Sequence, residues 1–372
     1  MTPLRACLTV EQLWQPQPGG SGRYVLELAA ALRRRTDVEV TGVRARHGGP
    51  PEGTWAPPED LPVVASRLPR PALYEAWARL RRPRTWRPAR PDVVHATTWA
   101  VPPRGGPGLV VTVHDLAFLR DPTHFTPRGN AFFRRALEVV AREADEVVVV
   151  SEATRADAAA AGIDPERLHV VPHGVEVPQV AAATVAEVRE RLGLTRPYVM
   201  WCGTIEPRKN VRTLLEAFAV VARSSDLDLL LVGPRGWGDP DLDRALRALP
   251  EGRVHLAGQV DSATLHAAYA GARAFCFPSV WEGFGMPVLE AMAHGVPVVT
   301  SAGTSMAEIA GADRALLVPP LDAAAMADAI LEAAGPSHGR LATAGRAYAE
   351  QQTWDRCAEQ TLAVYRRAAA RR

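Results

Sequence analysis

The sequence is almost without lysine and asparagine. Lys209 is the single lysine among 43 basic residues, and Asn130 and Asn210 are the only asparagines in 372 residues. Alanine, arginine, glycine and proline are abundant, which indicates a compositional bias rather than a role for most arginines. Lys209 and Asn210 are adjacent in the stretch GTIEPRKN, so this stretch departs from the bias at two successive positions.

Cysteine is also scarce, and long apolar runs are absent. The four cysteines lie far apart, and Cys7, Cys202 and Cys276 fall inside apolar runs where a thiol acts as a small core residue. We therefore expect a reduced, cytoplasmic protein. No apolar run approaches 18 residues and the N-terminus lacks the layout of a signal peptide, so we expect no membrane span.

The net charge is only +2, which gives no electrostatic case for nucleic acid as a partner. Two DxD strings occur, but neither reads as a metal site. Asp226-Leu-Asp228 leads into a predicted apolar strand. Asp241-Leu-Asp243 lies in a predicted helical segment with several charged residues. We predict no metal and no cofactor.

Short apolar runs alternate with amphipathic stretches along the whole chain. Strands are predicted at 5–10, 38–43, 92–96, 109–113, 146–150, 168–171, 198–202, 227–232, 254–257, 272–277, 296–300 and 316–318. Helices are predicted in the first half at 22–35, 71–82, 128–144 and 151–161. Continuous apolar strands separated by helices are typical of parallel sheets covered on both faces, so the sequence predicts an α/β protein.

A chain of 372 residues is too long for one ordinary core, and we expect two doubly wound domains. The proline-bearing segment 170–180 is the predicted linker. The first domain comprises 1–175, with a terminal amphipathic helix (353–370, within 353–372) packing back on it, and the second comprises 176–352. Because such sheets bind ligands beyond the carboxyl ends of their strands, we expect the site in the cleft between the domains.

The most informative segment is FPSVWEGFGMPVLEAMAHGVPVVTS, residues 277–301. A strand is predicted to end at Pro278, and the loop 282–285 leads into a helix that begins at Pro287 and stops at Gly295. Two glycines before a helix let the backbone approach an anion closely. Glu282 and Glu290 could then grip two hydroxyl-bearing parts of one ligand. The alternative is that Glu290 complements the helix dipole and Glu282 is a solvated loop residue.

GTIEPRKN, residues 203–210, has the same layout after the strand at 198–202. Arg208 and Lys209 lie in the turn before a helix that begins at Val211, with Asn210 as its expected N-cap. Arginine offers a planar fork, whereas lysine is a compact charge suited to a phosphate oxygen approached end-on. We interpret the retained lysine as a phosphate ligand. The alternative is a solvated turn.

The first half carries a second pair of candidates. A glycine-rich turn at 16–22 half-matches GxGxxG, but no acidic residue ends the second strand, so a dinucleotide site is disfavoured. Close approach of this backbone to a phosphate or sugar stays open. His114 and Asp115 end a strand, and His114 could hydrogen-bond a substrate hydroxyl. The alternative is that Asp115 caps a turn and His114 is bonded locally.

The segment ARLRRPRTWRPAR, residues 78–90, holds six arginines and Trp86, with Trp77 just upstream. Basic residues interleaved with tryptophan can dock on anionic lipid surfaces. A solvated loop under the arginine bias is the alternative. We keep peripheral contact with the inner face of the membrane as a subsidiary hypothesis.

Together these motifs resemble the retaining glycosyltransferases of family 4, which have the GT-B fold. EGFGMPVLEAMAHGVPVV resembles the E-x7-E signature of that family, and 110–137 looks like bacterial mannosyl- and related transferases. Supporting similarities in the family's order are GGSGRY, VSEATRAD, VVPHGV, GTIEPRKN, LLLVG, VHLAGQV and QQTWDRCAEQTLAVYRRA. The resemblance implies two Rossmann-like domains with an interdomain cleft and a C-terminal helix that crosses back to the first.

The resemblance also implies roles for the residues. The second domain would hold a nucleotide-sugar donor, with Glu290 on the ribose hydroxyls, Glu282 on the transferred sugar, and Arg208 and Lys209 on the diphosphate. The first domain would hold the acceptor. Other implied donor contacts are Gly20, Ser21, Gly22, Val260, Gly283, Phe284, Gly285, Met286 and Leu289. The implied acceptor side comprises His114, Asp115 and Arg23, and the implied catalytic set is Glu282, His114, Lys209 and Arg208.

The expected activity is metal-independent hexosyl transfer, with retention, from GDP-mannose or another GDP- or UDP-sugar to a saccharide, lipid-linked or small-molecule hydroxyl. One departure matters: several relatives carry a basic residue directly after the glycine corresponding to Gly203, where this chain has Thr204. Arg208 and Lys209 should then neutralise more of the negative charge of the phosphates. The alternatives are a nucleotide-sugar 2-epimerase of the same fold and an inactive sugar-nucleotide-binding partner subunit.

Overall fold

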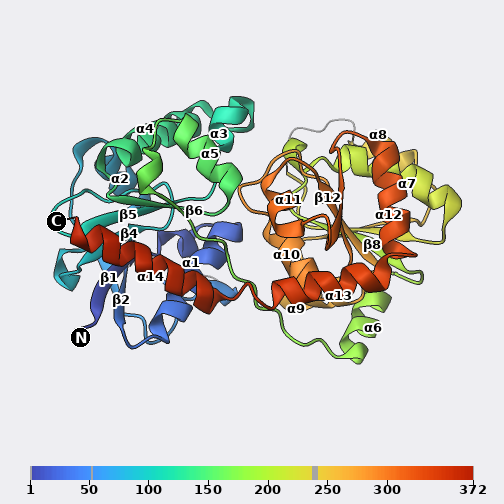
Figure 1. The fold of residues 1–372 in the computed structure, drawn as a ribbon, viewed down its shortest axis with the longest axis horizontal. Helices are drawn as coiled ribbons and strands as arrows, with labels where there is room; N and C mark the ends of the chain where they lie inside the picture. The colour runs from blue at the N-terminus through green and yellow to red at the C-terminus, as the bar shows by residue number, and fades with distance from the viewer. Residues whose placement is uncertain (1, 52, 237–241, 372) are drawn as a thin grey trace. The chain divides into compact units, whose positions relative to one another are not determined.

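The computed structural model describes residues 2–51, 53–236 and 242–371, so Asp241 of the second DxD string lies outside the described residues. The chain divides into two compact units. The N-terminal unit comprises Met1–Gly174 and Trp354–Arg372, and the C-terminal unit comprises Val175–Thr353. Each unit is a parallel sheet with helices on its faces (Figure 1).

Within the described residues, the N-terminal sheet has seven strands in the order β3-β2-β1-β4-β5-β6-β7. The strands are β1 (Leu4–Thr9), β2 (Val38–Arg46), β3 (Val63–Pro69), β4 (Val93–Ala96), β5 (Gly108–Val113), β6 (Glu146–Val149) and β7 (Leu168–Val170). The α-helices are α1 (Gly19–Arg33), α2 (Arg70–Glu75), α3 (Ala117–Arg120), α4 (Pro127–Glu143), α5 (Glu152–Ala160) and α14 (Trp354–Ala370).

The described part of the C-terminal unit holds a six-stranded sheet in the order β10-β9-β8-β11-β12-β13. Its strands are β8 (Tyr198–Cys202), β9 (Asp228–Val232), β10 (Val254–Gly258), β11 (Ala274–Phe277), β12 (Val298–Ser301) and β13 (Ala315–Val318). Its α-helices are α6 (Ala182–Arg191), α7 (Val211–Ser224), α8 (Leu242–Arg247), α9 (Ser262–Ala270), α10 (Met286–Ala293), α11 (Ser305–Ala310), α12 (Ala323–Ala334) and α13 (His338–Ala349).

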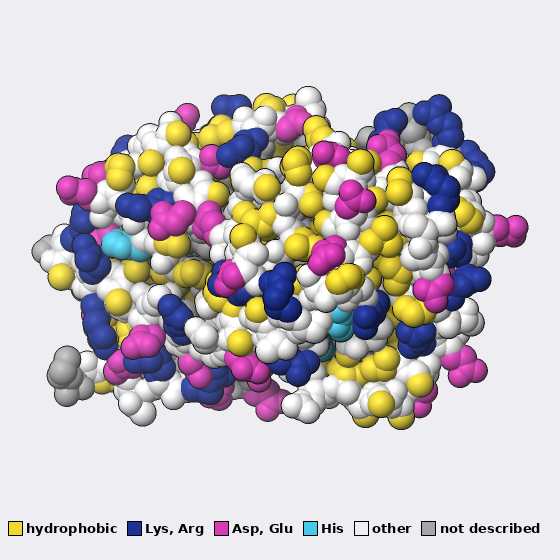
Figure 2. Space-filling model, turned by 45° about the vertical axis from the view of Figure 1, so that its right-hand side comes forward, with side chains coloured by type: hydrophobic (Ala, Val, Ile, Leu, Met, Phe, Trp, Pro, Cys, Tyr) yellow, Lys and Arg dark blue, Asp and Glu magenta, His cyan; other side chains and the backbone are white. Residues whose placement is uncertain are grey.

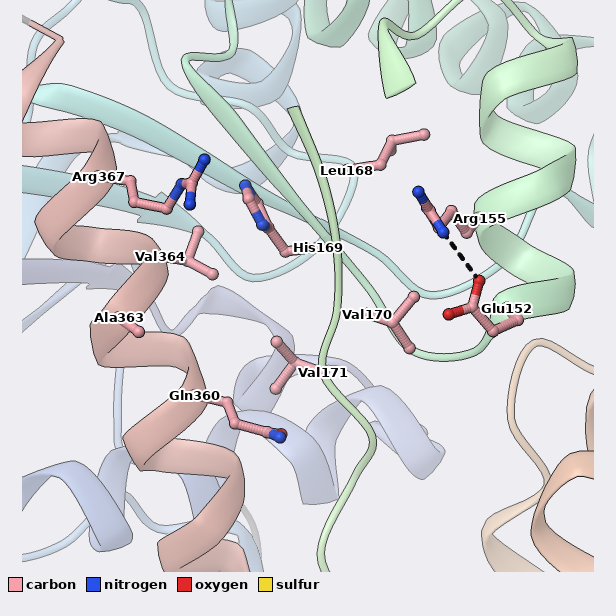
Figure 3. Close-up of a pocket in the computed structure, with 10 residues that line it drawn as sticks. All are labelled: Glu152, Arg155, Leu168, His169, Val170, Val171, Gln360, Ala363, Val364 and Arg367. Carbon is pink, nitrogen blue, oxygen red and sulfur yellow. Dashed lines mark hydrogen bonds and ion pairs between the residues drawn. The ribbon is translucent and has the colours of Figure 1, made fainter. Parts of the chain in front are cut away.

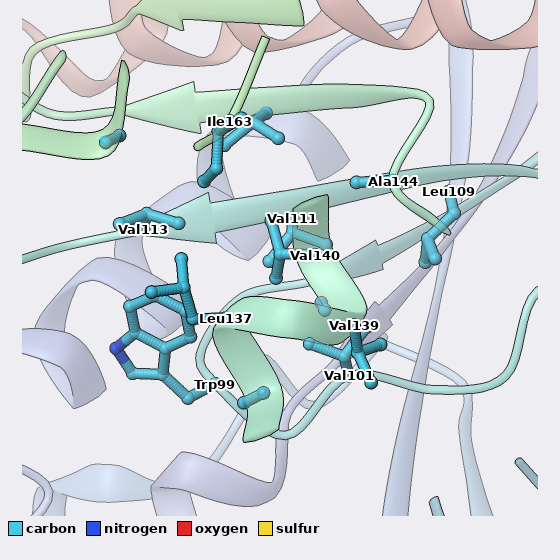
Figure 4. Packing of buried hydrophobic residues seen from close by; sticks show 14 of the residues in the cluster. Trp99, Val101, Leu109, Val111, Val113, Leu137, Val139, Val140, Ala144 and Ile163 are labelled. Atoms are coloured by element: carbon cyan, nitrogen blue, oxygen red, sulfur yellow. The ribbon is translucent and has the colours of Figure 1, made fainter. Parts of the chain in front are cut away.

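The central strands are buried on both faces, which confirms the prediction of two doubly wound α/β sheets. Every residue of β5 and β6 is buried, and valines of β5 pack under α4 together with Trp99 and Leu137 (Figure 4). Side chains that face helices on both sides need no polar alternation, so these strands are continuous apolar runs. The order of strands in each sheet reverses once, between β1 and β4 and between β8 and β11.

Helix α14 returns to the N-terminal unit and lies beside α1 (Figure 1). Its Tyr365 Oη lies 2.7 Å from His95 Nδ1 of β4, and both residues are buried. A Cβ on Gly108 would lie 2.6 Å from the carbonyl oxygen of Ala368, so glycine permits the helix to approach β5 closely. This confirms the predicted terminal helix.

Several sequence predictions need correction. The edge strand β3 was not predicted, because it is partly exposed and has no continuous apolar run. The predicted helix at 71–82 is α2 followed by a π-helical turn (Ala76–Leu80) that ends at Arg81 with φ of 50°. The expectation that Trp77 and Trp86 interleave with the arginines at a surface is wrong, because both indoles are buried.

No helix in the described part of the chain is both long and apolar enough to cross a membrane. On the face seen in Figure 2, basic and acidic side chains are interspersed, in keeping with the small net charge.

Candidate active site

Two segments singled out in the sequence meet at one edge of the C-terminal sheet. β8 pairs with β11 where the strand order reverses, the position at which open α/β sheets bind ligands. After β8 the chain passes through a 3₁₀ turn, Pro207–Lys209, into α7, and after β11 it passes through the loop 278–285 into α10. The Val280 N–H donates to the Arg208 carbonyl at 2.9 Å, which joins the turn to the loop.

Both predicted cations contact the carboxylate of Glu282. Lys209 Nζ lies 2.5 Å from Oε1, and Arg208 Nη1 lies 2.7 Å from Oε2. Ser279 Oγ donates a further hydrogen bond to Oε1 at 3.0 Å. Lys209 and Glu282 are only 8% and 9% exposed, so the alternatives of a solvated turn and a solvated loop residue are wrong. The three charges form a cluster in which Lys209 and Glu282 are buried and Arg208 is half-buried.

The cluster is extended by two residues whose roles the sequence did not suggest. Arg208 Nε lies 2.7 Å from Glu206 Oε1, so the guanidinium bridges two carboxylates. Lys209 Nζ lies 4.8 Å from the centroid of the Phe277 ring, a cation–π contact that a compact ammonium can make in this buried position.

These contacts fix the protonation state of Glu282. Burial by itself raises the pKa of the carboxyl, but Lys209 and Arg208 oppose this more strongly and hold the pKa at about 2. Glu282 is therefore ionised at neutral pH and only accepts hydrogen bonds. It can hold cations or sugar hydroxyls, but it cannot serve as a general acid.

The loop before α10 is held by side chains from other elements. Ser305 Oγ donates to the carbonyl of Glu282 at 2.7 Å and contacts the Phe284 carbonyl at 3.2 Å. Gly285 has φ of 110°, and a Cβ there would lie 2.7 Å from Met306 Cγ. α10 begins at Met286, one residue before the predicted start, and Gly295 follows its end with φ of 72° as predicted.

Asn210 precedes α7 as expected but does not cap it with its side chain. It adopts the left-handed conformation, with φ of 56° and ψ of 37°, which asparagine tolerates better than most residues. Its Nδ2 donates to the carbonyls of Pro278 and Pro320 at 3.1 and 2.5 Å. The asparagine therefore ties the turn after β8 to the loops after β11 and β13.

Glu290 is half-buried on α10, where Tyr269 Oη donates to its Oε2 at 3.1 Å. Most of the other predicted donor contacts lie in the loop before α10 or on α10 itself. Gly283, Phe284 and Gly285 are buried, Met286 is half-buried, and Leu289 is only 1% exposed, which gives its side chain a packing role in the core. Val260 follows β10 and is half-buried.

In the N-terminal unit, His114 follows β5 near the reversal of strand order. Its Nε2 lies 2.9 Å from the Thr97 carbonyl, and because a carbonyl only accepts, Nε2 carries the proton. Burial lowers the pKa of His114 to about 4, opposed by this bond, so the imidazole is neutral at neutral pH. Nδ1 is the nitrogen that can accept a hydrogen bond from a hydroxyl. Asp115 Oδ1 accepts from the Ala117 N–H at 3.1 Å, as in the alternative in which Asp115 caps a turn.

The glycine-rich stretch forms the first turn of α1 rather than a turn before it. The helix starts at Gly19, with Gly20 exposed, Ser21 half-buried and Gly22 buried. A Cβ on Gly22 would lie 2.3 Å from Pro18 Cβ, so packing already requires glycine there. Arg23 pairs with Glu27 on the same helix at 2.9 Å.

The matches to known proteins agree with this architecture. Residues 18–178 match the sequence model described as Glycosyltransferase Family 4, and residues 196–335 match the one described as Glycosyl transferases group 1. O-antigen chain mannosyltransferase B of Escherichia coli is 30% identical, over 93% of this chain and 96% of its own length. The chain belongs to the family 4 glycosyltransferases. A D-inositol 3-phosphate glycosyltransferase of Xylanimonas cellulosilytica is also 30% identical, over 95% of this chain and 93% of its own.

The fold of this glycosyltransferase is GT-B, as predicted. The crystal structure of HepE from Anabaena, in complex with UDP and glucose, aligns with a TM-score of 0.74 over 97% of this chain and 98% of that chain. The identity is 18%, so this likeness concerns the fold.

Sequence reasoning missed the side chains that hold the named residues of the glycosyltransferase in place. Glu206 and Ser279 lie inside the quoted motifs, so their polar character was the available signal. Tyr269 lies in α9, a helix that the sequence analysis did not predict. Tyr24 packs edge-on against His114, with ring centroids 4.8 Å apart. Tyr24 ends the quoted motif GGSGRY, whereas no quoted motif contains Tyr269.

A hollow of about 400 Å³ lies elsewhere in the N-terminal unit of the enzyme, between α5, β7 and α14 (Figure 3). Arg155 and Glu152 pair at 3.2 Å on its α5 side. None of the predicted site residues lines this hollow. In the described part of the chain, no group of three or more His, Cys, Asp or Glu side chains could hold a metal ion.

Proposed function

We propose that this glycosyltransferase moves a hexosyl group from a nucleoside-diphosphate sugar to a hydroxyl of a saccharide, lipid-linked or small-molecule acceptor. GDP-mannose is the first candidate donor, with other GDP- or UDP-sugars as alternatives. The observation that carries the proposal is the convergence of Arg208 and Lys209 on the Glu282 carboxylate beside the start of α10. The near full-length similarity to a mannosyltransferase supports mannose as the sugar.

The proposed donor site follows from the charges of the C-terminal unit. Arg208 and Lys209 bind the diphosphate, and the first turn of α10 adds the positive end of its dipole. Glu282 accepts hydrogen bonds from the transferred sugar, and Glu290 accepts them from the ribose hydroxyls. When the donor binds, its phosphate oxygens compete with Glu282 for the two cations. The backbone at 283–286 lines the sugar, and Val260 lies by the base.

The proposed reaction retains the configuration of the anomeric carbon. The bond from C1 to the diphosphate oxygen breaks, and the acceptor oxygen bonds to C1 from the same face. The proton of the acceptor hydroxyl passes to the departing phosphate oxygen, so no protein base is required. Fixed cations stabilise the charge that develops on the diphosphate. Neutral His114 accepts a hydrogen bond from a substrate hydroxyl at Nδ1.

A ligand screen followed by a transfer assay tests the proposal. UDP, GDP, ADP and TDP and their sugars are compared by thermal shift, since a specific ligand stabilises the fold by mass action. The stabilising donor is then incubated with candidate acceptors, and the anomer of the product is determined by NMR.

Unchanged transfer by Glu282→Gln would contradict the site assignment. Epimerised UDP-sugar formed without acceptor would favour the epimerase, and donor binding without either reaction would favour the inactive subunit.

Metal independence is part of the proposal, because Arg208 and Lys209 supply the positive charge that a divalent cation would otherwise provide at the diphosphate. We expect transfer in excess EDTA at the same rate as with added Mg²⁺ or Mn²⁺. A loss of activity in EDTA that Mn²⁺ restores would contradict this part.

We also propose, as a subsidiary point, peripheral contact of 78–90 with the anionic inner face of a membrane. The tryptophans are buried, but Leu80 is 72% exposed among exposed arginines. These exposed arginines are Arg79, Arg82, Arg84, Arg87 and Arg90. Co-sedimentation with vesicles rich in phosphatidylglycerol, lost in Leu80→Glu, is the expected result. No binding at low salt would end the hypothesis.

A further inference from the structure

Glu290 is hydrogen-bonded to a fully buried tyrosine. Tyr269 of α9 is 0% exposed, and its Oη donates to Glu290 Oε2 at 3.1 Å. The same oxygen lies 2.9 Å from Sγ of Cys202, the last residue of β8. Three elements, β8, α9 and α10, are thus joined through one hydroxyl group.

The direction of these hydrogen bonds follows from the number of protons. A phenol has a single O–H, and Tyr269 donates it to Glu290 Oε2. Cys202 must then donate its S–H to the Tyr269 oxygen. Burial, the largest cause, raises the pKa of the Cys202 thiol to about 12, and burial also raises the pKa of Tyr269, so both groups keep their protons.

The ring of Tyr269 has little freedom to turn. It stacks on His294 with ring centroids 5.7 Å apart and planes 12° from parallel, and Phe275 lies 5.4 Å away on β11. His294 is itself held, because its Nε2 lies 3.0 Å from Nδ1 of His266. The phenol oxygen is therefore held in place, and its hydrogen bond fixes the position of Glu290 Oε2.

We propose that Tyr269, oriented by Cys202, is a positioning residue that sets the Glu290 carboxylate for recognition of the ribose of the donor. This rests on the proposed function, which assigns Glu290 to the ribose hydroxyls. A carboxylate held by a fixed donor loses less rotational freedom on meeting a ligand. The pair therefore determines how strongly the enzyme prefers a ribonucleotide over its deoxy analogue.

The test measures the dissociation constants of GDP and UDP and of their 2′,3′-dideoxy analogues by titration calorimetry. The quantity compared is the ratio of the dideoxy to the ribo constant. From the strength of hydrogen bonds to charged groups, we expect a wild-type ratio of roughly tenfold to a hundredfold. Glu290→Gln should lower it several-fold, because a neutral amide accepts hydrogen bonds more weakly than a carboxylate does. Tyr269→Phe should lower it about threefold to tenfold, with the affinity for the dideoxy nucleotide unchanged.

Tyr198→Phe is the matched control. Its hydroxyl is also buried, but it donates to the Ala268 carbonyl at 2.6 Å instead of to the site. We expect its ratio to equal that of the wild type. If Tyr269→Phe fails to fold, Cys202→Ala decides, with an expected decrease of about twofold to threefold in the ratio.

The outcomes separate the two proposals. A lowered ratio in Glu290→Gln together with unchanged ratios in Tyr269→Phe and Cys202→Ala overturns the positioning role and leaves the proposed function standing. An unchanged ratio in Glu290→Gln overturns the assignment of Glu290 to the ribose, and the positioning role with it. An equal loss of affinity for ribo and dideoxy nucleotides in Tyr269→Phe shows a structural role only.

Discussion

Among the charged side chains of the candidate site, Lys209 is buried and has close neighbours. Its Nζ lies between the Glu282 carboxylate and the ring of Phe277. A guanidinium is larger and planar, so it cannot take the place of the ammonium without displacing these neighbours. The retained lysine thus has a packing reason as well as an electrostatic one.

We predict that Lys209→Arg lowers kcat of sugar transfer by at least about tenfold, and that Lys209→Ala lowers it further and raises the KM for the donor. The charge matters most in the transition state, when the diphosphate departs. Steady-state kinetics with saturating acceptor measure both effects. Arg212→Lys, at an exposed arginine paired with Glu216, is the control and should be neutral. Full activity of Lys209→Arg would show that charge alone is required.

A second prediction concerns Glu282 and acid. Its pKa in the folded protein is about 2, below the usual 4.5, so the ion cluster stabilises the fold fully above about pH 4.5. This contribution is lost as the pH falls from 4.5 towards 2. Glu282→Gln removes it, and we expect the variant to be less stable by on the order of 2 kcal/mol at pH 7.

Urea unfolding of both proteins between pH 2.5 and 7 measures this contribution. The difference in unfolding free energy between wild type and Glu282→Gln should shrink as the pH falls. Glu216→Gln, in an exposed i,i+4 pair with Arg212, is the control and should differ little at any pH. A difference that does not change with pH would refute the ion-pair explanation.

At the scale of elements, the loop 278–285 is set by backbone geometry. Gly285→Ala should destabilise the protein by roughly 1–3 kcal/mol through its positive φ, and by more through the contact with Met306. It should also weaken nucleotide binding. Gly303→Ala is a matched control, because Gly303 has φ of 69° but nothing within 4 Å of its Cβ position. Equal losses in the two variants would show that the contact with Met306 is unimportant.

The elements show why some features could be predicted and others could not. Strands such as β5 and β9 are buried apolar runs, so their composition alone identifies them. β3 is a partly exposed edge strand, and its pattern is weak. The motifs at 203–210 and 282–290 were visible as a turn and a loop before helices. The contact of Lys209 with Glu282 was not, because it spans 73 positions and depends on β8 pairing with β11.

At the scale of the whole molecule, each unit has its own sheet and core. A nucleotide bound to the C-terminal unit and a substitution in the N-terminal unit should therefore each affect only the unit concerned. We predict that GDP or UDP, whichever binds, slows amide hydrogen exchange at 203–210 and 278–290 in the C-terminal unit. Tyr365→Phe, which removes the hydrogen bond to His95, should speed exchange in β4 and α14 of the N-terminal unit. Exchange measured by mass spectrometry on the full chain resolves both effects. Faster exchange of Tyr365→Phe at 203–210 would contradict the separation.

The membership of α14 in the N-terminal unit also affects biosynthesis. The C-terminal unit is continuous in the chain, from Val175 to Thr353, whereas the N-terminal unit is interrupted by it. During translation, the later unit is therefore the first for which every residue has been made. The earlier unit must wait until Trp354–Ala370 leaves the ribosome, and until then the surface that receives Tyr365 stays open. A ribosome that stops after Thr353 would release a complete C-terminal unit beside an unfinished N-terminal one.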